Sequence, residues 1–557
     1  EYSELNQYWS PYDSTGNIAK ILETVSDVVT PEIITIYTNP LYNATLHTVN
    51  QSGYSNITNR TNIEYNIGNG LRLSGNVGIT RQHDKSDIFL PAQHTSFETQ
   101  ADFSRRGSYT KSSGEFFSVE GNIKLDYSHT WGRHQLFNTT GVGLLQTNSQ
   151  NTIVKVEGFP NDRLDQILFG NSYQLNSKPS GLYSVTRRFS QFSNFNYNYD
   201  NRYLADFSVS ADGASQFGAD KRVGVFWSAG FGWNMHKESF FREGDVVNEL
   251  RLKATIGTAG DNNFNPNQAI TTYKYFTDQN YRGMVGATLI GYGNRQLQWQ
   301  QTLKKNIGVD LSLFKKRFNL SLDVYRETTS NLILGITTPP SEGITSYKEN
   351  IGELENRGYE FRMHALVIRN TPKNITWSVY VNGNHNKDRI KKISNTLKYQ
   401  NSQNDKNDDK TQSVPRFRFE EGLSTNAIWA VQSLGIDPST GRELYRKLDG
   451  TLTYSWDPSD KTVVGNTIPD MRGSFGTNFT YRNFGAGIYF SYEFGGQMYN
   501  QTVKDKVEDA DLRWQVDRRV LEGRWTKPGD ITKYKGLVDI NGREVTSDTK
   551  VTSRFVQ

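Results

Sequence analysis

Hydrophobic and polar residues alternate along residues 221–235, whose sequence is KRVGVFWSAGFGWNM. Trp227, Phe231 and Trp233 belong to one set of alternate positions, while glycine, serine and asparagine fill most of the other set, and only Phe226 breaks the pattern. Successive side chains of a strand point to opposite faces. The pattern therefore predicts a β-strand with one apolar and one small, polar face. Such a strand fits either a soluble sheet or a sheet that separates lipid from a wet interior.

The same alternation recurs along the chain in about fourteen segments. Most of them reach the roughly 9 to 11 residues that a tilted strand needs to cross a bilayer, whereas strands of globular proteins usually have about five or six. The predicted strands are 57–67, 71–81, 117–129, 135–147, 185–199, 202–212, 223–235, 250–258, 303–314, 317–328, 358–368, 375–386, 474–481 and 486–494.

The connections between the predicted strands alternate between short and long. Examples of tight turns are 68–70, 131–134, 200–201, 315–316 and 482–485, and the long polar loops include 82–116, 148–184, 259–302, 330–357 and 387–472. In an up-and-down meander every second connection lies on the same side, so all short turns share one rim. This asymmetry is typical of outer-membrane barrels, and a Greek-key sandwich gives no reason for it.

We therefore predict an all-β fold, a transmembrane antiparallel up-and-down β-barrel, in which 387–472 is a long extracellular loop region. In the strand at 223–235 the large apolar residues face lipid, and the small and polar ones face a wet interior. The residues assigned to lipid are Val225, Trp227, Phe231 and Trp233, and those assigned to the interior are Gly224, Ser228, Gly230 and Asn234.

The composition agrees with such a barrel. Hydrophobic residues make up 35% of the 557 residues, below the roughly 45–50% of average globular proteins, and the mean hydropathy is -0.67. Only every second residue of a barrel strand meets lipid, so a low hydropathy is compatible with membrane insertion. Aromatic residues reach 13% and cluster near strand ends, as Tyr197, Tyr199 and Tyr203 do, which is typical of the girdle at a membrane interface.

The search for chemistry gives no catalytic residue, no metal site and no cofactor. The chain has no cysteine, which excludes disulfides and cysteine metal sites. Residues 213–218, GASQFG, lack the spacing of a nucleophile elbow, and 257–264, GTAGDNNF, lack the lysine of a phosphate loop. Residues 404–409, NDKNDD, lack the glycine and glutamate of a calcium loop. A net charge of +5 without a long basic run does not indicate nucleic-acid binding.

Three aromatic residues of the loops, Tyr292, Trp299 and Trp429, are of the type that stacks on sugar rings. Packing explains each of them equally well. We therefore predict no particular substrate-binding residue.

A series of short motifs runs along most of the chain. They are DNRYL at 200–204, DGASQFG at 212–218, LRLKAT at 250–255, NIGELENRGYE at 350–360, GIDP at 435–438, GQMYN at 496–500 and RWTKPGD at 524–530. In this order and spacing they resemble the SusC-like (RagA-type) branch of the TonB-dependent outer-membrane transporters of Bacteroidetes. The resemblance extends from about Tyr8 to Phe555.

The resemblance implies a barrel of 22 strands in the bacterial outer membrane, filled by an amino-terminal plug. Residues 1–557 correspond to part of that barrel, without the plug, the first strands and the last strands. We expect the rest of the same polypeptide, or another chain, to complete the wall, because open strand edges in lipid leave backbone groups unpaired.

The same resemblance implies active import of oligosaccharides or peptides rather than an enzymatic activity. The implied partners are a SusD-like surface lipoprotein as lid, the TonB–ExbB–ExbD system acting through the plug, and outer-membrane lipid and lipopolysaccharide. Pairing of such complexes into dimers is also implied, and no nucleic acid is. Two alternatives remain: a passive porin or surface adhesin with the same barrel, and a secreted soluble β-rich glycan hydrolase.

Overall fold

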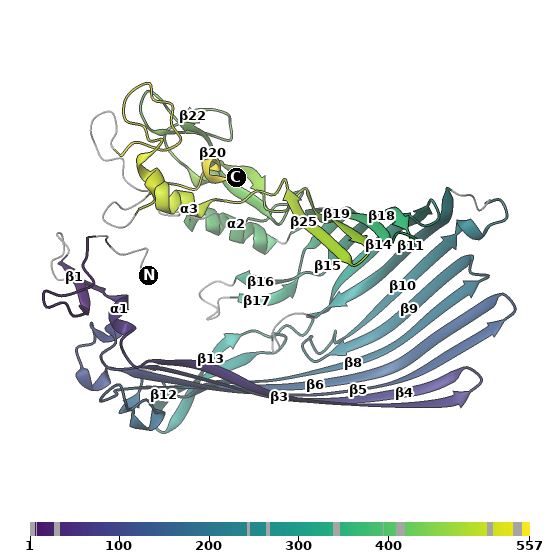
Figure 1. The fold of residues 1–557 in the computed structure, drawn as a ribbon. Helices are drawn as coiled ribbons and strands as arrows, with labels where there is room; N and C mark the ends of the chain where they lie inside the picture. Colours follow the sequence, from purple (N-terminus) through teal and green to yellow (C-terminus); the bar gives the residue numbers. More distant parts are fainter. Residues whose placement is uncertain are drawn as a thin grey trace.

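The computed structural model describes residues 6, 8–26, 34–175, 177–241, 246–262, 268–337, 346–393, 395–407, 418–509, 516–537 and 549–557. Fourteen long strands form one antiparallel sheet, and each of them pairs with the long strand that precedes it and the long strand that follows it in the sequence (Figure 1). They are β3 (Val49–Gly68), β4 (Leu71–Leu90), β5 (Ser108–Trp131), β6 (His134–Glu157), β8 (Ser180–Tyr199), β9 (Tyr203–Ala214), β10 (Val223–Asn234), β11 (Val247–Asp261), β14 (Gln300–Leu313), β15 (Phe318–Ser330), β18 (Glu353–Asn370), β19 (Ile375–Lys392), β24 (Met471–Tyr481) and β25 (Phe484–Phe494).

Smaller elements lie in the connections and beside the sheet. The short strands are β1 (Ile21–Ser26), β2 (Ile34–Thr38), β7 (Ser172–Tyr173), β12 (Thr272–Tyr281), β13 (Met284–Gly291), β16 (Ile333–Thr337), β17 (Ser346–Asn350), β20 (Ala427–Ile436), β21 (Glu443–Arg446), β22 (Leu452–Thr453) and β23 (Lys461–Asn466). The α-helices are α1 (Pro40–Asn43), α2 (Asn395–Asn407) and α3 (Gln501–Val503), and a π-helical turn follows at Lys504–Glu508. Single 3-10 turns lie at Thr95–Phe97, Phe103–Arg105, Ile167–Phe169, Met235–Lys237, Pro458–Asp460, Arg518–Leu521 and Ser553–Phe555.

Each of the fourteen predicted strands corresponds to one strand of the large sheet, so the all-β up-and-down prediction is confirmed. Several strands are longer than predicted, and β5 and β6 have 24 residues each. The additional residues lie at the long-loop end. There the backbone ladder continues, for example from Ser108↔Glu157 to Phe116↔Ser149, although strict alternation of apolar and polar residues has ended.

The tight turns gather at one end of the sheet and the long connections at the other (Figure 1). In the turn between β8 and β9, Asp200 and Asn201 both have positive φ, 56° and 52°. Aspartate and asparagine tolerate this left-handed conformation better than most residues. Because such a turn has a fixed length and conformation, it sets the register between the two strands that it joins.

One face of the sheet carries large apolar side chains that the rest of the described chain leaves exposed. Val225, Trp227 and Phe231 are 60%, 39% and 51% exposed. The described residues form no second sheet stacked on this face. Among the described residues these side chains are therefore not packed in the core of a β-sandwich, which agrees with their assignment to lipid.

Buried apolar residues instead form small clusters, and one of them explains the break at Phe226. Phe226 is 8% exposed and packs with Phe217 and Trp299 on the opposite face from Trp227. A Cβ atom on Gly260 would lie 2.1 Å from the Phe226 ring. Glycine at this position therefore leaves room for the ring, which anchors the loop that precedes β14.

Aromatic rings and histidines form a series of ring contacts at the short-turn rim. Consecutive ring centroids are 4.9 to 6.4 Å apart. The series runs from β5 to β9 through Tyr127, His129, Trp131, His134, Tyr199 and Tyr203. This arrangement matches the aromatic girdle expected at a membrane interface.

Region 387–472, predicted as one long loop, contains regular structure. β19 extends to Lys392, helix α2 follows, and β20 to β23 form a four-stranded sheet in the order β22-β21-β20-β23. Figure 1 shows this small sheet together with α3 beyond the long-loop end of the large sheet. No helix among the described residues is both long enough and apolar enough to span a membrane.

Candidate functional site

The polar face of the large sheet carries a row of residues directly opposite one another, and all of them except one glycine have ionisable or amide side chains. The row crosses seven strands, and we refer to it as the polar row. From β11 to β25 its members are Lys253, Gly308, Asp323, Glu360, Asn384, Arg472 and Glu493. Because side chains alternate along each strand, the neighbouring positions, such as Leu252, Val309 and Leu322, belong to the apolar face.

A second row lies two residues away along each strand, on the same face. Its members are Arg251, Asp310, Ser321, Arg362, Asn382, Ser474 and Ser491. The two rows together place acids, bases, amides and hydroxyls within reach of one another across the sheet.

Lys253 connects three strands. Its Nζ lies 3.2 Å from Asp310 Oδ1 on β14 and 3.2 Å from the carboxylate of Asp323 on β15. Asp310 also accepts a hydrogen bond of 2.6 Å from Ser321 Oγ, and Asp323 accepts one of 3.1 Å from Asn306 Nδ2. The two acids are therefore held in place at this end of the polar row.

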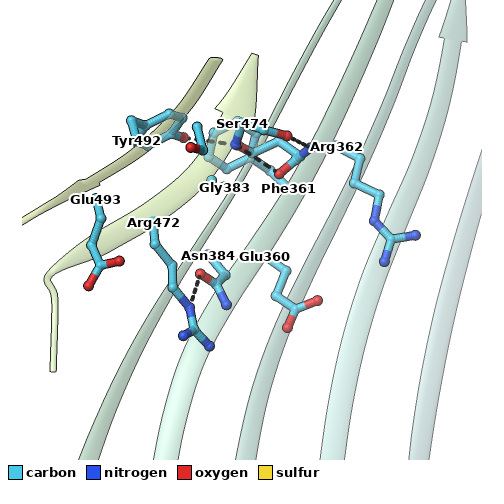
Figure 2. Close-up of a pocket in the computed structure, with 12 residues that line it drawn as sticks. Glu360, Phe361, Arg362, Gly383, Asn384, Arg472, Ser474, Tyr492 and Glu493 are labelled. Carbon is cyan, nitrogen blue, oxygen red and sulfur yellow. Dashed lines mark hydrogen bonds between the residues drawn. The ribbon is translucent and has the colours of Figure 1, made fainter. Parts of the chain in front are cut away.

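A hollow of about 480 Å³ lies against β18, β19, β24 and β25. Figure 2 shows Glu360, Asn384, Arg472 and Glu493 extending in the same direction from these four strands. Arg472 Nε donates to Asn384 Oδ1 at 3.4 Å. Glu360, Arg362 and Glu493 make no ion pair within 4 Å with any residue that the structure describes, so charges of both signs remain available at the hollow.

A second hollow, of about 390 Å³, adjoins the first and shares Arg362 and Asn382 with it. Its other polar lining residues are Asp310, Ser312, Asn319, Ser321, His364 and Tyr380. The second hollow is also lined by Leu311, Leu320, Met363 and Val381. The polar side chains of the two hollows can hydrogen-bond to hydroxyl, amide and charged groups of a ligand. The described part of the chain brings no three His, Asp or Glu side chains together in a way that could hold a metal ion.

The loop aromatics considered from the sequence have different environments. Trp299 is 7% exposed, packs 4.4 Å from Phe217 and donates from Nε1 to the backbone oxygen of Arg222 at 3.0 Å. Trp429 is 6% exposed. Packing therefore accounts for both tryptophans, and of the three only Tyr292, 40% exposed, offers a ring surface.

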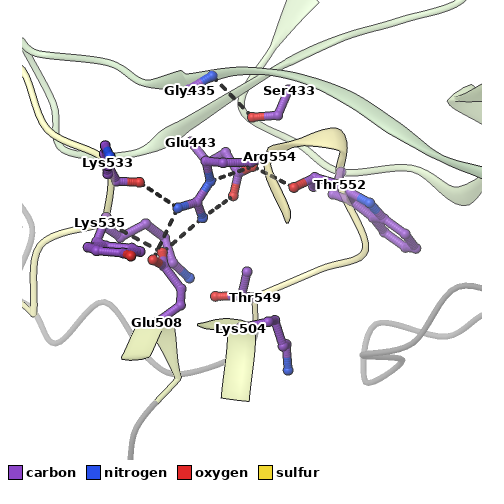
Figure 3. A network of polar contacts seen from close by, with 12 residues as sticks. Ser433, Gly435, Glu443, Lys504, Glu508, Lys533, Lys535, Thr549, Thr552 and Arg554 are labelled. Carbon is purple, nitrogen blue, oxygen red and sulfur yellow. Dashed lines mark hydrogen bonds and ion pairs between the residues drawn. The ribbon is translucent and has the colours of Figure 1, made fainter. Parts of the chain in front are cut away.

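Beyond the long-loop rim, a buried ionic network joins residues 549–557 to the small sheet (Figure 3). Arg554 Nη2 lies 3.0 Å from Glu443 Oε2 and 2.9 Å from Glu508 Oε1, and both carboxylate side chains are almost fully buried. Burial alone would lower the pKa of Arg554, but the charges of Glu443 and Glu508 outweigh it and raise the pKa above its usual value. The guanidinium is thus a fixed charge that joins β21 to the π-helical turn at Lys504–Glu508.

One continuous antiparallel sheet with an apolar outer face and a polar inner face defines an outer-membrane β-barrel wall. The chain belongs to the family of TonB-dependent receptor-like β-barrels, whose model matches residues 2–526. This family consists of receptors rather than enzymes. The polar row therefore lines the lumen of the barrel.

Among curated relatives, TonB-dependent receptor P39 of Formosa agariphila is 26% identical over 552 residues, which cover 90% of this chain and 50% of the relative. TonB-dependent receptor SusC of Bacteroides thetaiotaomicron is 26% identical over 333 residues, covering 57% of this chain and 32% of SusC. The chain thus spans about half the length of P39. The structure of the RagAB peptide transporter superposes with a TM-score of 0.79 at 20% identity, over 99% of this chain and 58% of that chain.

These comparisons confirm the SusC-like, RagA-type resemblance and the outer-membrane location. Sequence reasoning assigned aspartate, serine, asparagine and glycine to a wet interior but did not identify the polar row. Its residues come from strands up to 240 positions apart in the numbering, from Lys253 to Glu493. The tight turns set the register within each hairpin, but the long connections between β11 and β14, β15 and β18, and β19 and β24 leave the register between hairpins open, so the sequence did not indicate the row.

Proposed function

We propose that this chain forms part of the wall of a TonB-coupled importer of oligosaccharides or peptides, working with a plug and closed by a SusD-like lipoprotein. The observation that carries the proposal is the hollow of about 480 Å³ on the polar face, where Glu360, Arg362 and Glu493 make no ion pair within 4 Å with a described residue. Family membership supports energy-coupled import over a passive porin or an adhesin.

A polar oligomer suits this surface because it can exchange one weak contact for the next. Conduction requires binding sites that are favourable enough to enter and weak enough to leave. The rows provide acids, bases and amides on successive strands, which match sugar hydroxyls as well as peptide groups. RagAB, whose structure resembles this one, is a peptide transporter, which supports peptides as the substrate. The relative SusC supports the same class of importer.

The wall needs further strands. Among the described residues, β3 and β25 each pair on one side only, and unpaired backbone groups in hydrocarbon are costly. We infer that additional strands of the same polypeptide, or of another chain, close the barrel to the 22 strands implied by the family. The long-loop rim with its small sheet then supplies the surface for the lipoprotein, and two such complexes can pair as a dimer.

The proposal is tested by deleting the gene and complementing the strain with the wild type or with Glu360→Gln, Arg472→Gln and Glu493→Gln combined. Uptake of labelled oligosaccharides and peptides is measured with and without the proton gradient, and ligand that copurifies from detergent is identified by mass spectrometry. We expect the deletion to abolish uptake of one ligand class and the triple variant to reduce it several-fold.

The matched control is Glu522→Gln, which removes an acid of an exposed pair with Arg518 away from the lumen, and it should import normally. Uptake that continues without the proton gradient would favour the passive porin. Normal uptake in the deletion strain, together with the absence of a copurified lipoprotein, would remove the importer proposal.

A further inference from the structure

The outer face of β14, β15, β18 and β19 changes from apolar to basic at the same level on all four strands. The outward positions are read here from the short-turn rim towards the long-loop end. On β14 Leu311, Val309 and Ile307 are followed by a lysine, and on β15 Leu320, Leu322 and Val324 are followed by an arginine. On β18 Met363, Phe361 and Tyr359 are followed in the same direction by an arginine, and on β19 Val379, Val381, Gly383 and His385 are followed by a lysine. The four cations are Lys305, Arg326, Arg357 and Lys387, each directly opposite the next. We call them the basic row.

The basic row lies at the extracellular boundary of the apolar band. Lys305 comes eight residues before Leu313, which ends β14 at the short-turn rim, and this corresponds to roughly 27 Å along an antiparallel strand. With the usual strand tilt the height is about 20 Å, close to the roughly 25 Å of the apolar band of such barrels. The row therefore meets the headgroup region of the outer leaflet.

The charge of this surface is unbalanced. All four residues of the basic row are exposed, and like charges directly opposite one another on neighbouring strands are destabilising. Glu355, the acid beside the row, is bound by Arg326 at 2.5 Å and lies 3.9 Å from Lys391. Lys305, Arg357 and Lys387 make no ion pair with any described residue. An anion from outside the chain would relieve their repulsion.

An apolar hollow of about 520 Å³ lies directly below two members of the basic row. Its walls are formed by Phe231, Ile256, Ile307 and Val324, its floor includes the small residues Ala229 and Ala254, and Lys305 and Arg326 lie at its edge. A slot of this kind accepts a hydrocarbon chain, while the cations above it accept a phosphate. The two features together match a molecule with an acyl chain and an anionic headgroup.

We propose that this surface binds a phosphorylated glycolipid of the outer leaflet, with its phosphates on the basic row and an acyl chain in the apolar hollow. The row crosses three strand spacings, roughly 14 Å, which suits a broad saccharide headgroup better than the single phosphate of a glycerophospholipid. The inference rests on the outer-membrane location and not on the proposed import activity.

The experiment uses the complete receptor in nanodiscs and measures the affinity for lipid A, dephosphorylated lipid A, phosphatidylglycerol and inorganic phosphate. A triple variant is made that combines Lys305→Gln, Arg357→Gln and Lys387→Gln. Its affinity for lipid A should be about 100-fold lower, because each cation near a lipid headgroup raises the affinity about fivefold. Glu355→Gln removes the neighbouring acid and should raise the affinity several-fold. Ala254→Phe should weaken lipid A binding by filling the hollow.

The matched control is Lys304→Gln, which changes the adjacent residue on the opposite face, where Lys304 pairs with Glu327 at 3.1 Å. It should bind lipid A normally, and heat-dependent electrophoretic mobility verifies that all variants are folded. Equal affinity of the triple variant and the wild type, or of lipid A with and without phosphate, would overturn the proposal. Equally tight binding of phosphatidylglycerol or inorganic phosphate would overturn the assignment to a glycolipid. A change in oligomeric state with unchanged lipid binding would assign the surface to a protein partner instead.

Discussion

Lys253 and Asp323 form an ion pair of 3.2 Å although their strands, β11 and β15, are not neighbours. The lysine side chain crosses β14 above Gly308, where a Cβ atom would lie 2.2 Å from Lys253 Cε and 2.4 Å from Asp323 Oδ1. Glycine at this position thus permits a contact across three strands. The lumen charge pattern depends on a residue that has no side chain.

Gly308→Ala should displace the Lys253 side chain and break the pair with Asp323. The loss of stability should stay below about 1 kcal/mol, because partly exposed ion pairs contribute little. Uptake by the complemented strain should fall, and Gly308→Ala should have no further effect in a Lys253→Met background, since the two changes remove the same contact. Gly121→Ala is the control, because a Cβ there meets its nearest atom, Asn76 O, at an ordinary 3.8 Å. Additive effects of the two substitutions would contradict this account.

Arg554→Ala should destabilise the small sheet beyond the long-loop rim. The substitution leaves the carboxylates of Glu443 and Glu508, 2% and 0% exposed, without their shared cation. Breaking a buried ion pair by removing one partner costs about 3–5 kcal/mol. Hydrogen exchange in β20 and β21 should accelerate accordingly, while exchange in β5 and β6 stays unchanged.

Arg519→Ala is the control for that experiment. Arg519 pairs with Asp517 at 2.7 Å, but the two side chains are 49% and 30% exposed. Removing such a surface pair should change stability by less than about 1 kcal/mol. Similar acceleration of exchange in β20 by both substitutions would mean that burial of the Arg554 network is not what stabilises this sheet.

Asp437→Asn should produce a pH-dependent loss of stability in the turn between β20 and β21. A hydrogen bond from the Tyr454 hydroxyl, together with those from Ser439, lowers the pKa of Asp437 from 3.8 to about 2. Because the folded pKa is depressed, the ionised carboxylate stabilises the turn above about pH 4, and this contribution is lost as the pH falls towards 2. Hydrogen exchange of residues 437–446, corrected for intrinsic rates, should differ between the two proteins at pH 7 and differ much less at pH 2, where about half of the Asp437 carboxylates are protonated. A difference as large at pH 2 as at pH 7 would contradict the shift.

The membrane-crossing part of each strand could be predicted because lipid imposes a strict alternation on it. The strand Val223–Asn234 shows this alternation. Its exception, Phe226, packs against Trp299 of a distant loop, a contact that no local sequence pattern could indicate. The outer ends of β5 and β6 were missed for a related reason. Both of their faces meet water, so residues such as Lys111 and Ser113 follow no apolar period while the backbone ladder continues.

The small sheet and the polar row escaped prediction because they depend on distant partners. β20 pairs with Thr552 through Val431, and Arg554 reaches Glu443, contacts across more than one hundred positions of the chain. β21 and β22 have only four and two residues, too few for any periodicity. The polar row needs the register of seven strands at once, which the tight turns set for each hairpin and the long loops leave open.

Val209→Arg and Ser208→Arg test which face of the wall meets lipid. Val209 lies opposite Trp227 on β10, on the apolar face, whereas Ser208 lies opposite Ser228 on the lumen face. An arginine that faces hydrocarbon near the middle of the bilayer costs about 2–4 kcal/mol, while one that faces the lumen stays hydrated. The complete receptor refolded into lipid vesicles should therefore lose stability to urea with Val209→Arg and keep it with Ser208→Arg. Equal losses, or a larger loss with Ser208→Arg, would reverse the assignment of the two faces, and the lumen position of the polar row and the lipid position of the basic row would both have to be exchanged.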